Sequence, residues 1–290
     1  MMYKCLLWGM GKILIENINL IKYFETKGDI KVIAITGNED AVTFYGYKYI
    51  NKMDINAEDY DLVIIMAKSV TEIKNEAIKV GFPERKIIFY PVLRYPDLKF
   101  DDLKKLINNV PSIFSMNCWG GIVYHRLGLE FKSPFINMFL EEGDYIKFLG
   151  EPKHYIETNL EVIEYLYNKD LDINYPVCLC DDIKLFFNHY SSYEQALFCW
   201  NKRKKRIEWN NLFVTMYTNN EDIIRKFYEL PYKKKVCFTS LNTEKNDSIY
   251  LKRKADEEYY KTVSSVAWGK NPEIDIIQLL LHGSKSVILR

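Results

Sequence analysis

The sequence predicts an α/β protein of two domains, each with a mainly parallel sheet. Short apolar runs of strand length alternate along the chain with longer segments in which apolar residues recur at helical spacing. The run "DLVIIMA" at 61–67 lacks polar alternation, as expected of a strand buried on both faces of a sheet. Chains in which strands and helices alternate form parallel, right-handed, doubly wound sheets.

The first domain is expected over residues 1–100. Its strands fall in "YKCLLW", "IKVIAITG", "DLVIIMA" and "KIIFYPV", and its helices in "ILIENINLIKYFETKG" and "SVTEIKNEAIKVG". A helical connector over 101–110 is closed by Pro111, because proline cannot continue a helix. The second domain then covers 111–290.

The second domain repeats the alternation. Strands are expected in "SIFSM", "SPFINMFL", "NLFVTMYT", "KKVCFTS" and "SIYLKR", and the run "PVCLCDDIKLFFNHY" is expected to be extended. Helices are expected in "GGIVYHRLGLEF", in 141–168 as one or two helices broken at Pro152, and in "SSYEQALFCWNKRKKRI", "NNEDIIRKFYELP" and "NPEIDIIQLLLHG".

Charge and composition restrict the classes of protein. The 40 basic and 39 acidic residues nearly cancel, which argues against a nucleic-acid partner. No apolar run approaches the ~20 residues that span a bilayer, although peripheral membrane contact stays open. The N-terminus lacks a small-residue cleavage site, and the six cysteines show no paired spacing typical of zinc ligands. A reduced, cytoplasmic chain without a metal site is expected, and the oligomeric state is not assigned.

The turn "GMGK" after the first strand is similar to the Rossmann dinucleotide-binding fingerprint in part. Gly9 and Gly11 match its first two glycines, while Leu14 stands in place of the third. After the second strand, where an acid would hold a ribose hydroxyl, the chain has "TGN", and Glu39 and Asp40 follow late. Because strands and helices alternate in both halves of the chain, both domains are expected to be Rossmann-like.

Backbone amides at the start of the following helix could bind a phosphate. Gly9, Gly11 and Lys12 are thus candidate residues for a nucleotide or nucleotide sugar, whereas NAD as a redox cofactor is disfavoured. The alternative is that both glycines simply permit a tight turn between strand and helix.

The stretch "SMNCWGG" at 115–121 is a second candidate, because ligands of open α/β sheets bind beyond the carboxyl ends of strands. Its glycines allow close backbone approach, and the helix start offers amide donors for an anion. The alternative is a steric corner with a buried thiol. The candidate binding residues are Ser115, Asn117, Trp119, Gly120 and Gly121, with Cys118 as a candidate catalytic group.

Further candidates follow the run "DDIKLFFNHY". His189 continues an apolar strand face at its solvent-exposed end, a position that suits a general base or a phosphate ligand. A structural histidine that forms hydrogen bonds within the fold is an equal alternative. Asp182 is a candidate catalytic carboxylate, but its neighbour Asp181 would point to the opposite strand face, so a metal site is not favoured. A nucleophilic pair of Cys118 with His125 or His189 is conceivable and less favoured than non-covalent chemistry.

In the basic run "NKRKKR", Arg203 and Lys204 fall on the apolar stripe of a predicted helix. Exposure to solvent accounts for the other basic residues of the run better than for these two. Arg203 is the better ligand for a phosphate or carboxylate, because its guanidinium is a rigid planar donor.

Over residues 111–220 the sequence resembles a bacterial domain-of-unknown-function family found among exopolysaccharide-biosynthesis proteins. The resemblance carries the family pattern onto "NCWGG" at 117–121, with Met116 departing from it, and onto Ser133, Pro134, Asn137, Asp182, His189, Tyr190, Trp200, Asn201, Arg203 and Arg206. It implies substrate-binding roles for Asn137, Tyr190 and Arg206, and it supplies a pathway context without a reaction.

The leading hypothesis is a transferase that acts on an activated sugar or a glycan precursor of bacterial surface polysaccharide, binding a diphosphate by positioned charge. The alternative is a non-catalytic nucleotide- or sugar-binding or assembly module of the same pathway. An NAD-dependent oxidoreductase is a third possibility, disfavoured by Leu14 and by the missing acid after the second strand.

Overall fold

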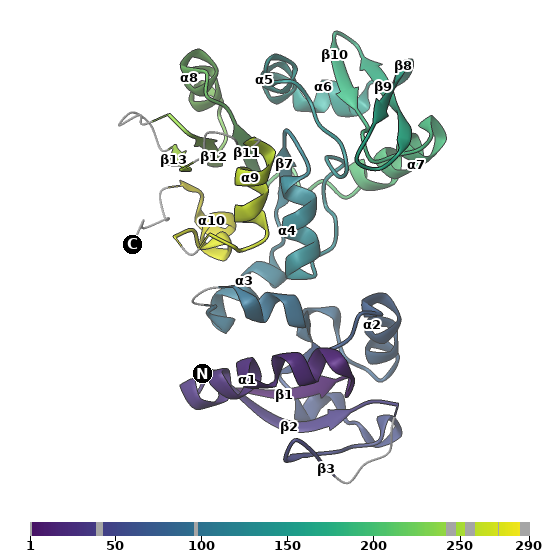
Figure 1. Cartoon of the computed structure of the whole chain (residues 1–290), viewed down its shortest axis with the longest axis vertical. Coiled ribbons are helices and arrows are strands. Elements are labelled where there is room, and N and C mark those ends of the chain that lie inside the picture. Colours follow the sequence, from purple (N-terminus) through teal and green to yellow (C-terminus); the bar gives the residue numbers. More distant parts are fainter. Residues whose placement is uncertain are drawn as a thin grey trace. The chain divides into compact units, whose positions relative to one another are not determined.

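The computed structural model describes residues 2–38, 43–95, 98–241, 248–252, 259–271 and 273–284. It divides into two compact units. The first consists of Met1–Asn108 with Arg126–Gly128, and the second of Asn109–His125 with Leu129–Arg290. Each unit combines helices with a parallel-strand sheet, so the chain is a mixed α/β protein (Figure 1).

The first unit is built on a parallel sheet in the order β2-β1-β5-β6. Its strands are β1 (Tyr3–Trp8), β2 (Ile30–Thr36), β5 (Leu62–Ile65) and β6 (Ile87–Phe89). All four residues of β5 are buried, which explains its unbroken apolar sequence. A small antiparallel ribbon, β3 (Thr43–Phe44) with β4 (Tyr47–Lys48), accompanies the sheet.

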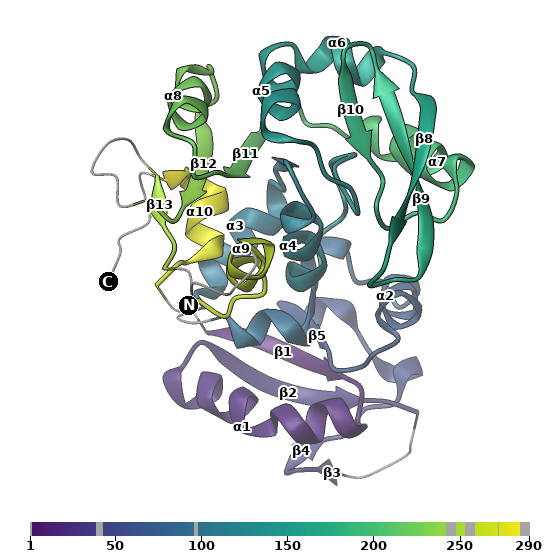
Figure 2. The same cartoon turned by 45° about the horizontal axis from the view of Figure 1, so that its top comes forward.

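The helices of the first unit are α1 (Lys12–Lys27), α2 (Val70–Lys79) and α3 (Phe100–Asn108), with short 3-10 segments at 52–54, 57–59, 84–86 and 90–94. Figure 2 shows α1 running along β1 and β2. It ends at Gly28, whose left-handed φ of 80° allows its amide to satisfy the last carbonyls of the helix. The connector expected over 101–110 is α3, which belongs to this unit.

The second unit contains a parallel sheet in the order β13-β12-β11-β7. Its strands are β7 (Ser112–Ser115), β11 (Leu212–Tyr217), β12 (Lys234–Thr239) and β13 (Ile249–Tyr250). The helices are α4 (Trp119–Leu127), α5 (Glu142–Gly150), α6 (Pro152–Glu157), α7 (Tyr193–Lys204), α8 (Glu221–Glu229), α9 (Tyr259–Ala267) and α10 (Ile276–His282). Among the α-helices of the described residues, α9 is the one that the sequence did not predict.

An antiparallel sheet, β10-β9-β8, also belongs to the second unit. It consists of β8 (Glu161–Asn168), β9 (Ile173–Cys180) and β10 (Ile183–Phe186). The assignment of residues 161–168 to a helix was wrong. The segment "EVIEYLYN" is rich in β-branched and aromatic residues, which favour strands, and its pairing with β9 prevails over helix formation.

The strand expected in "SPFINMFL" at 133–140 is also absent. The segment is a loop with a single bridge between Phe139 and Phe186 of β10. Asn137 adopts a left-handed φ of 62°, which interrupts an extended backbone, and Pro134 has no amide to give to a ladder. Within the described ranges, no helix is long and apolar enough to cross a membrane.

Candidate functional site

The glycine turn of the first unit joins β1 to α1. Gly9 has a φ of 124°, and a Cβ atom there would lie 2.7 Å from the carbonyl oxygen of Met66. The fold itself therefore requires glycine at position 9. Gly11 is different, because its φ of −86° suits any residue and a Cβ atom would meet nothing within 4 Å.

A cavity of about 600 Å³ opens beside this turn. Residues 8–13 after β1, 37–38 after β2 and 66–69 after β5 line it, so it lies at the carboxyl ends of three neighbouring strands. The chain leaves β1 toward β2 on one side, while β5 lies on the other. This reversal of strand order is the place where open α/β sheets bind ligands.

The cavity has charged walls and an uncapped helix end. Lys12, Lys52 and Lys68 line it together with Glu72 and Glu76. The Nζ atom of Lys52 lies 2.7 Å from the Glu76 carboxylate, so this lysine is already paired. Gly11 gives α1 no side-chain cap, and the first turn of α1 carries no acid, which leaves its positive end open to an anion. Glu39 and Asp40 lie outside the described residues.

The turn "SMNCWGG" of the second unit joins β7 to α4, and its amides are engaged internally. The Oδ1 atom of Asn117 accepts a hydrogen bond from the Trp119 amide at 3.0 Å, and the Ser115 hydroxyl accepts one from the Gly120 amide at 3.1 Å. Two of the donors expected to bind an anion therefore already have partners. Ser115 and Asn117 cap the helix.

The glycines and the tryptophan of this turn are packed. A Cβ atom on Gly120 would lie 2.9 Å from Ile113, and one on Gly121 would lie 3.3 Å from Ile136. Trp119 is buried and stacks on Phe213 with ring centroids 5.9 Å apart. These three residues form a tightly packed corner of the turn.

Cys118 is the exception in this turn, because its sulfur contacts a histidine. The distance from Cys118 Sγ to His189 Nε2 is 3.4 Å. Ile183, Leu185 and Phe187 are buried, whereas His189 after β10 is exposed. The structure thus brings together a candidate nucleophile and a candidate base that stand 71 residues apart. His125, the other base considered, is an exposed residue of α4.

Burial sets the protonation of this pair. It raises the pKa of the Cys118 thiol to about 11, against the opposing effect of backbone hydrogen bonds from Cys118 and Met138. Although His189 is exposed as a residue, partial burial of its side chain lowers its pKa, because burial penalises the charged imidazolium. Near neutral pH the thiol is therefore protonated and the imidazole is neutral.

The two candidate arginines, Arg203 and Arg206, contact other side chains of the second unit. Arg203 on α7 donates to the Tyr190 hydroxyl at 2.5 Å and lies over the Phe131 ring, and Tyr190 in turn donates to the Ile136 carbonyl. Arg206 pairs with the Glu130 carboxylate at 3.2 Å. The structure therefore gives Arg203 and Arg206 positioning contacts within the second unit.

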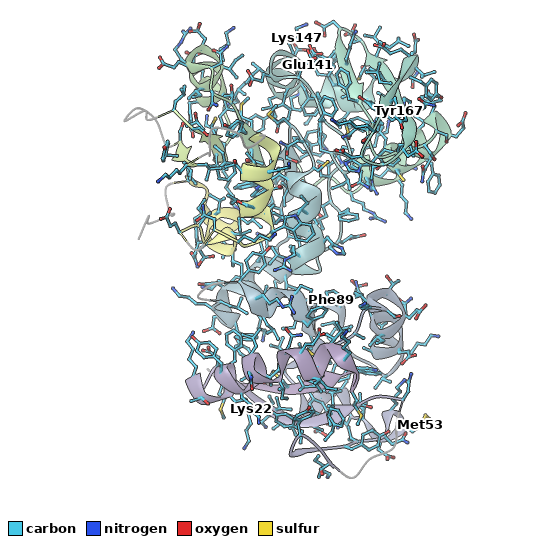
Figure 3. All side chains as sticks on the ribbon, in the orientation of Figure 1. Lys22, Met53, Phe89, Glu141, Lys147 and Tyr167 are labelled. Atoms are coloured by element: carbon cyan, nitrogen blue, oxygen red, sulfur yellow. The ribbon has the colours of Figure 1, made fainter. Side chains whose placement is uncertain are left out.

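Asp182 is placed apart from His189. The two aspartates form the turn between β9 and β10, with Asp181 at a φ of 56°, so they do not occupy opposite faces of a strand as expected. β10 separates Asp182 from His189. The Asp182 carboxylate lies 2.8 Å from Lys147 Nζ, a residue labelled in Figure 3, and accepts a hydrogen bond from Tyr155. These two partners lower the pKa of Asp182 below its ordinary value.

The loop at 133–140 contributes a further part of the site. The exposed Asn137 precedes Met138, whose carbonyl oxygen lies 4.0 Å from Cys118 Sγ. Ser133 is buried and accepts a hydrogen bond from the Phe135 amide, and Trp200 packs edge-on against Phe135. Asn201 is half-buried on α7.

Sequence reasoning missed a second cavity, of about 440 Å³, at the carboxyl ends of β7 and β11. It is lined by Met116, Phe139, Leu140, Glu141, Glu142, Tyr217 and Asn219. The signal that could have found it is the polar pair Asn219–Asn220 after β11, which ends a strand in the same way as Ser115 and Asn117. Sequence reasoning also missed two lysines that line the first cavity, Lys52 and Lys68.

Comparisons with known proteins give a family but no activity. An uncharacterised protein of Haemophilus influenzae is 32% identical over 139 residues, which are 47% of this chain and 65% of that protein. The match thus spans slightly less than two thirds of that relative. A crystal structure of aspartate semialdehyde dehydrogenase II from Vibrio cholerae is 8% identical, covering 82% of this chain and 83% of that one, with a TM-score of 0.27. That score is too low to carry an argument.

Two family models match the chain. Residues 1–88 match the model described as "C2185-like, N-terminal", and residues 90–277 match the model described as "Domain of unknown function (DUF1919)". The second match includes the Cys118 turn, His189 and Arg203. Because that model covers more than half of the chain, the protein belongs to the DUF1919 family.

Proposed function

We propose that the protein is a transferase of bacterial surface-polysaccharide synthesis whose first, Rossmann-like unit binds the phosphate of a nucleotide-linked sugar. The observation that carries the proposal is the cavity of about 600 Å³ at the strand-order reversal beside Gly11. Gly11 has no neighbour that would exclude a side chain, so the fold does not account for its glycine. Close approach of a phosphate to the backbone does account for it.

The charges in the cavity support a phosphate more than a neutral ligand. Lys12 and Lys68 line the cavity beside the open end of α1, and the pair of Lys12 with Glu16 at 3.7 Å is solvent-exposed and therefore weak. Among the described residues after β2, Gly37 and Asn38 line the cavity where a dinucleotide fold would place an acid on the ribose. This arrangement favours a nucleotide sugar over NAD.

Titration calorimetry of the full chain tests the binding step. The ligands are nucleoside diphosphate sugars of several bases, NAD and inorganic pyrophosphate. We expect at least one nucleotide sugar to bind more tightly than NAD. In Gly11→Val the added side chain fills the path of the phosphate, so affinity should fall by about tenfold or more, equivalent to about 1.4 kcal/mol.

Gly143→Val is the matched control, because Gly143 also has open space around it and lies in the second unit. It should bind as the wild type does. No binding of any nucleotide sugar, or equal affinity in Gly11→Val, would show that the turn is only a corner.

Turnover separates a transferase from a non-catalytic binding module of the same pathway. The engagement of Arg203 with Tyr190 and of Asp182 with Lys147 favours the module, because it occupies one expected binding group and one expected catalytic group. The measurement is chromatography of the nucleotide products in the presence of glycan acceptors. Release of the sugar from its nucleotide supports the transferase. Tight binding without turnover supports the module.

A further inference from the structure

The contact between Cys118 and His189 has a chemical consequence of its own. Sulfur and nitrogen lie 3.4 Å apart, a hydrogen-bonding distance for a thiol, so the imidazole is placed to take the thiol proton. We infer that Cys118 and His189 are a nucleophile and its general base, which accept an acyl group as a thioester and pass it to a hydroxyl. The pair lies in the second unit and needs no nucleotide at Gly11, so this activity goes beyond the proposed function.

The protonation of the pair suits this role. With burial holding the thiol protonated and the imidazole neutral, the nitrogen lone pair is free to receive the proton as the sulfur attacks. A neutral pair of this kind activates the nucleophile only during the reaction, as a serine–histidine pair does.

Access and the contact with a histidine together distinguish Cys118 from the other cysteines. Cys5, Cys178, Cys180 and Cys237 are buried, whereas Cys118 is only half-buried. Cys199 is half-buried like Cys118, but it lies on α7, and among the described residues no histidine contacts its sulfur. It therefore provides a matched thiol without a base.

The second cavity provides room for an acyl group. Its wall contains Met116, two residues before Cys118, and Phe139, one residue after Met138. The Leu140 amide donates to the Met116 carbonyl at 2.8 Å, and Met138 contacts Cys118, so these two segments run antiparallel beside each other. Two residues of chain span at most about 7 Å, so the Cys118 backbone lies within that distance of Met116 in the cavity wall, although Cys118 and His189 do not themselves line the cavity.

The lining of this cavity selects the acyl group. Met116, Phe139 and Leu140 give apolar walls, which suit a short hydrocarbon chain. Glu141 and Glu142 also line it and would repel a carboxylate or phosphate held there. The acyl group is therefore short and uncharged, and its donor is an activated ester or thioester.

The reaction balances in two steps. The thiol proton passes to His189 Nε2 as the sulfur bonds to the carbonyl carbon. The carbon–leaving-group bond then breaks, and the leaving group takes the proton from His189. In the second step a hydroxyl gives its proton to His189 and attacks the thioester carbon. The carbon–sulfur bond breaks, and the sulfur recovers the proton, so the enzyme returns unchanged.

The test uses p-nitrophenyl acetate on the full chain, without nucleotide. Intact-mass and peptide mass spectrometry should find one acetyl group on Cys118, together with steady release of nitrophenolate. Cys118→Ala, which removes the nucleophile, should abolish the adduct at that position. His189→Gln should slow acetylation of Cys118 by about tenfold or more, because a general base contributes typically about 10²–10⁴-fold.

Cys199→Ser and His154→Gln are the matched controls, since His154 bonds Asp181 and lies away from the thiol. Both should react as the wild type does. An equal rate of acetylation in His189→Gln and His154→Gln, or acetylation of Cys199 as fast as of Cys118, would overturn the inference. Iodoacetamide labelling of the unaltered chain gives the same comparison of Cys118 with Cys199 and needs no variant to fold.

Discussion

The two glycine turns of this protein look alike in sequence and differ in structure. Each follows the first strand of a parallel sheet and begins a helix, "GMGK" before α1 and "NCWGG" before α4. In the second turn Ser115 and Asn117 cap the helix amides, and both glycines touch side chains. In the first turn no side chain caps α1, and Gly11 faces open space.

The difference shows that different structural constraints can require glycine at a position. Gly9 is required by a close backbone, Gly120 by a close side chain, and Gly11 by neither. Where side chains of the fold accept hydrogen bonds from the helix amides, those amides are already satisfied. A turn with an uncapped helix end beside a cavity still has amides and space for an anion. The chemistry of the second turn then depends on its cysteine instead of its glycines.

Gly9→Ala should have the largest effect on stability. The alanine would hold a left-handed φ of 124° and place its Cβ atom 2.7 Å from a backbone oxygen. Strain and overlap together should lower the free energy of unfolding by about 3 kcal/mol or more. Urea unfolding followed by circular dichroism measures the loss. A change smaller than that of Gly11→Ala would refute the packing reason for glycine 9.

Gly120→Ala should have the next largest effect. The new methyl group would lie 2.9 Å from both the Ile113 side chain and the Ser115 hydroxyl, which itself accepts from the Gly120 amide. Overpacking of this kind costs about 1–3 kcal/mol, and the helix propensity of alanine recovers up to about 1 kcal/mol of it. Gly143→Ala is the control, because the same change in open space should not destabilise the protein.

The sequence predicted the strands and helices that periodicity marks and failed where tertiary pairing decides. Uninterrupted apolar runs such as "DLVIIMA" were correctly assigned. The helix prediction for β8 was wrong because its apolar residues fit both the helical and the strand periodicity. Pairing with β9 decides in favour of the strand. The loop at 133–140 was taken for a strand because the left-handed Asn137 leaves no mark in composition.

The candidate site shows the same limit. Strand-end logic indicated Cys118 and His189 separately, and the sequence left their pairing open among alternatives. Their 3.4 Å contact depends on how the antiparallel sheet returns the chain to β7, which no local pattern contains. Likewise, Arg203 finds Tyr190 13 residues before it and Asp182 finds Lys147 35 residues before it, and no local pattern shows that these charges already have partners.

Asn117→Ala should have a moderate effect. It removes the acceptor of the Trp119 amide at the start of α4, and loss of a helix cap costs about 1 kcal/mol. Asn117→Asp keeps an acceptor at the same place and should retain the stability. Thermal unfolding of the three proteins measures the order. If the aspartate variant loses as much as the alanine variant, the cap is not the reason for asparagine here.

Gly11→Ala should have the smallest effect on stability, and it completes the comparison. Its φ of −86° suits alanine, and no atom lies within 4 Å of the added Cβ, so the free energy of unfolding should change by less than about 0.5 kcal/mol. The first turn then differs from the second in tolerating a side chain. If the turn binds a phosphate, the same variant should bind nucleotide sugars more weakly although it unfolds at the wild-type urea concentration. Clear destabilisation by Gly11→Ala would mean that the fold does require this glycine, and the two turns would then serve one structural purpose.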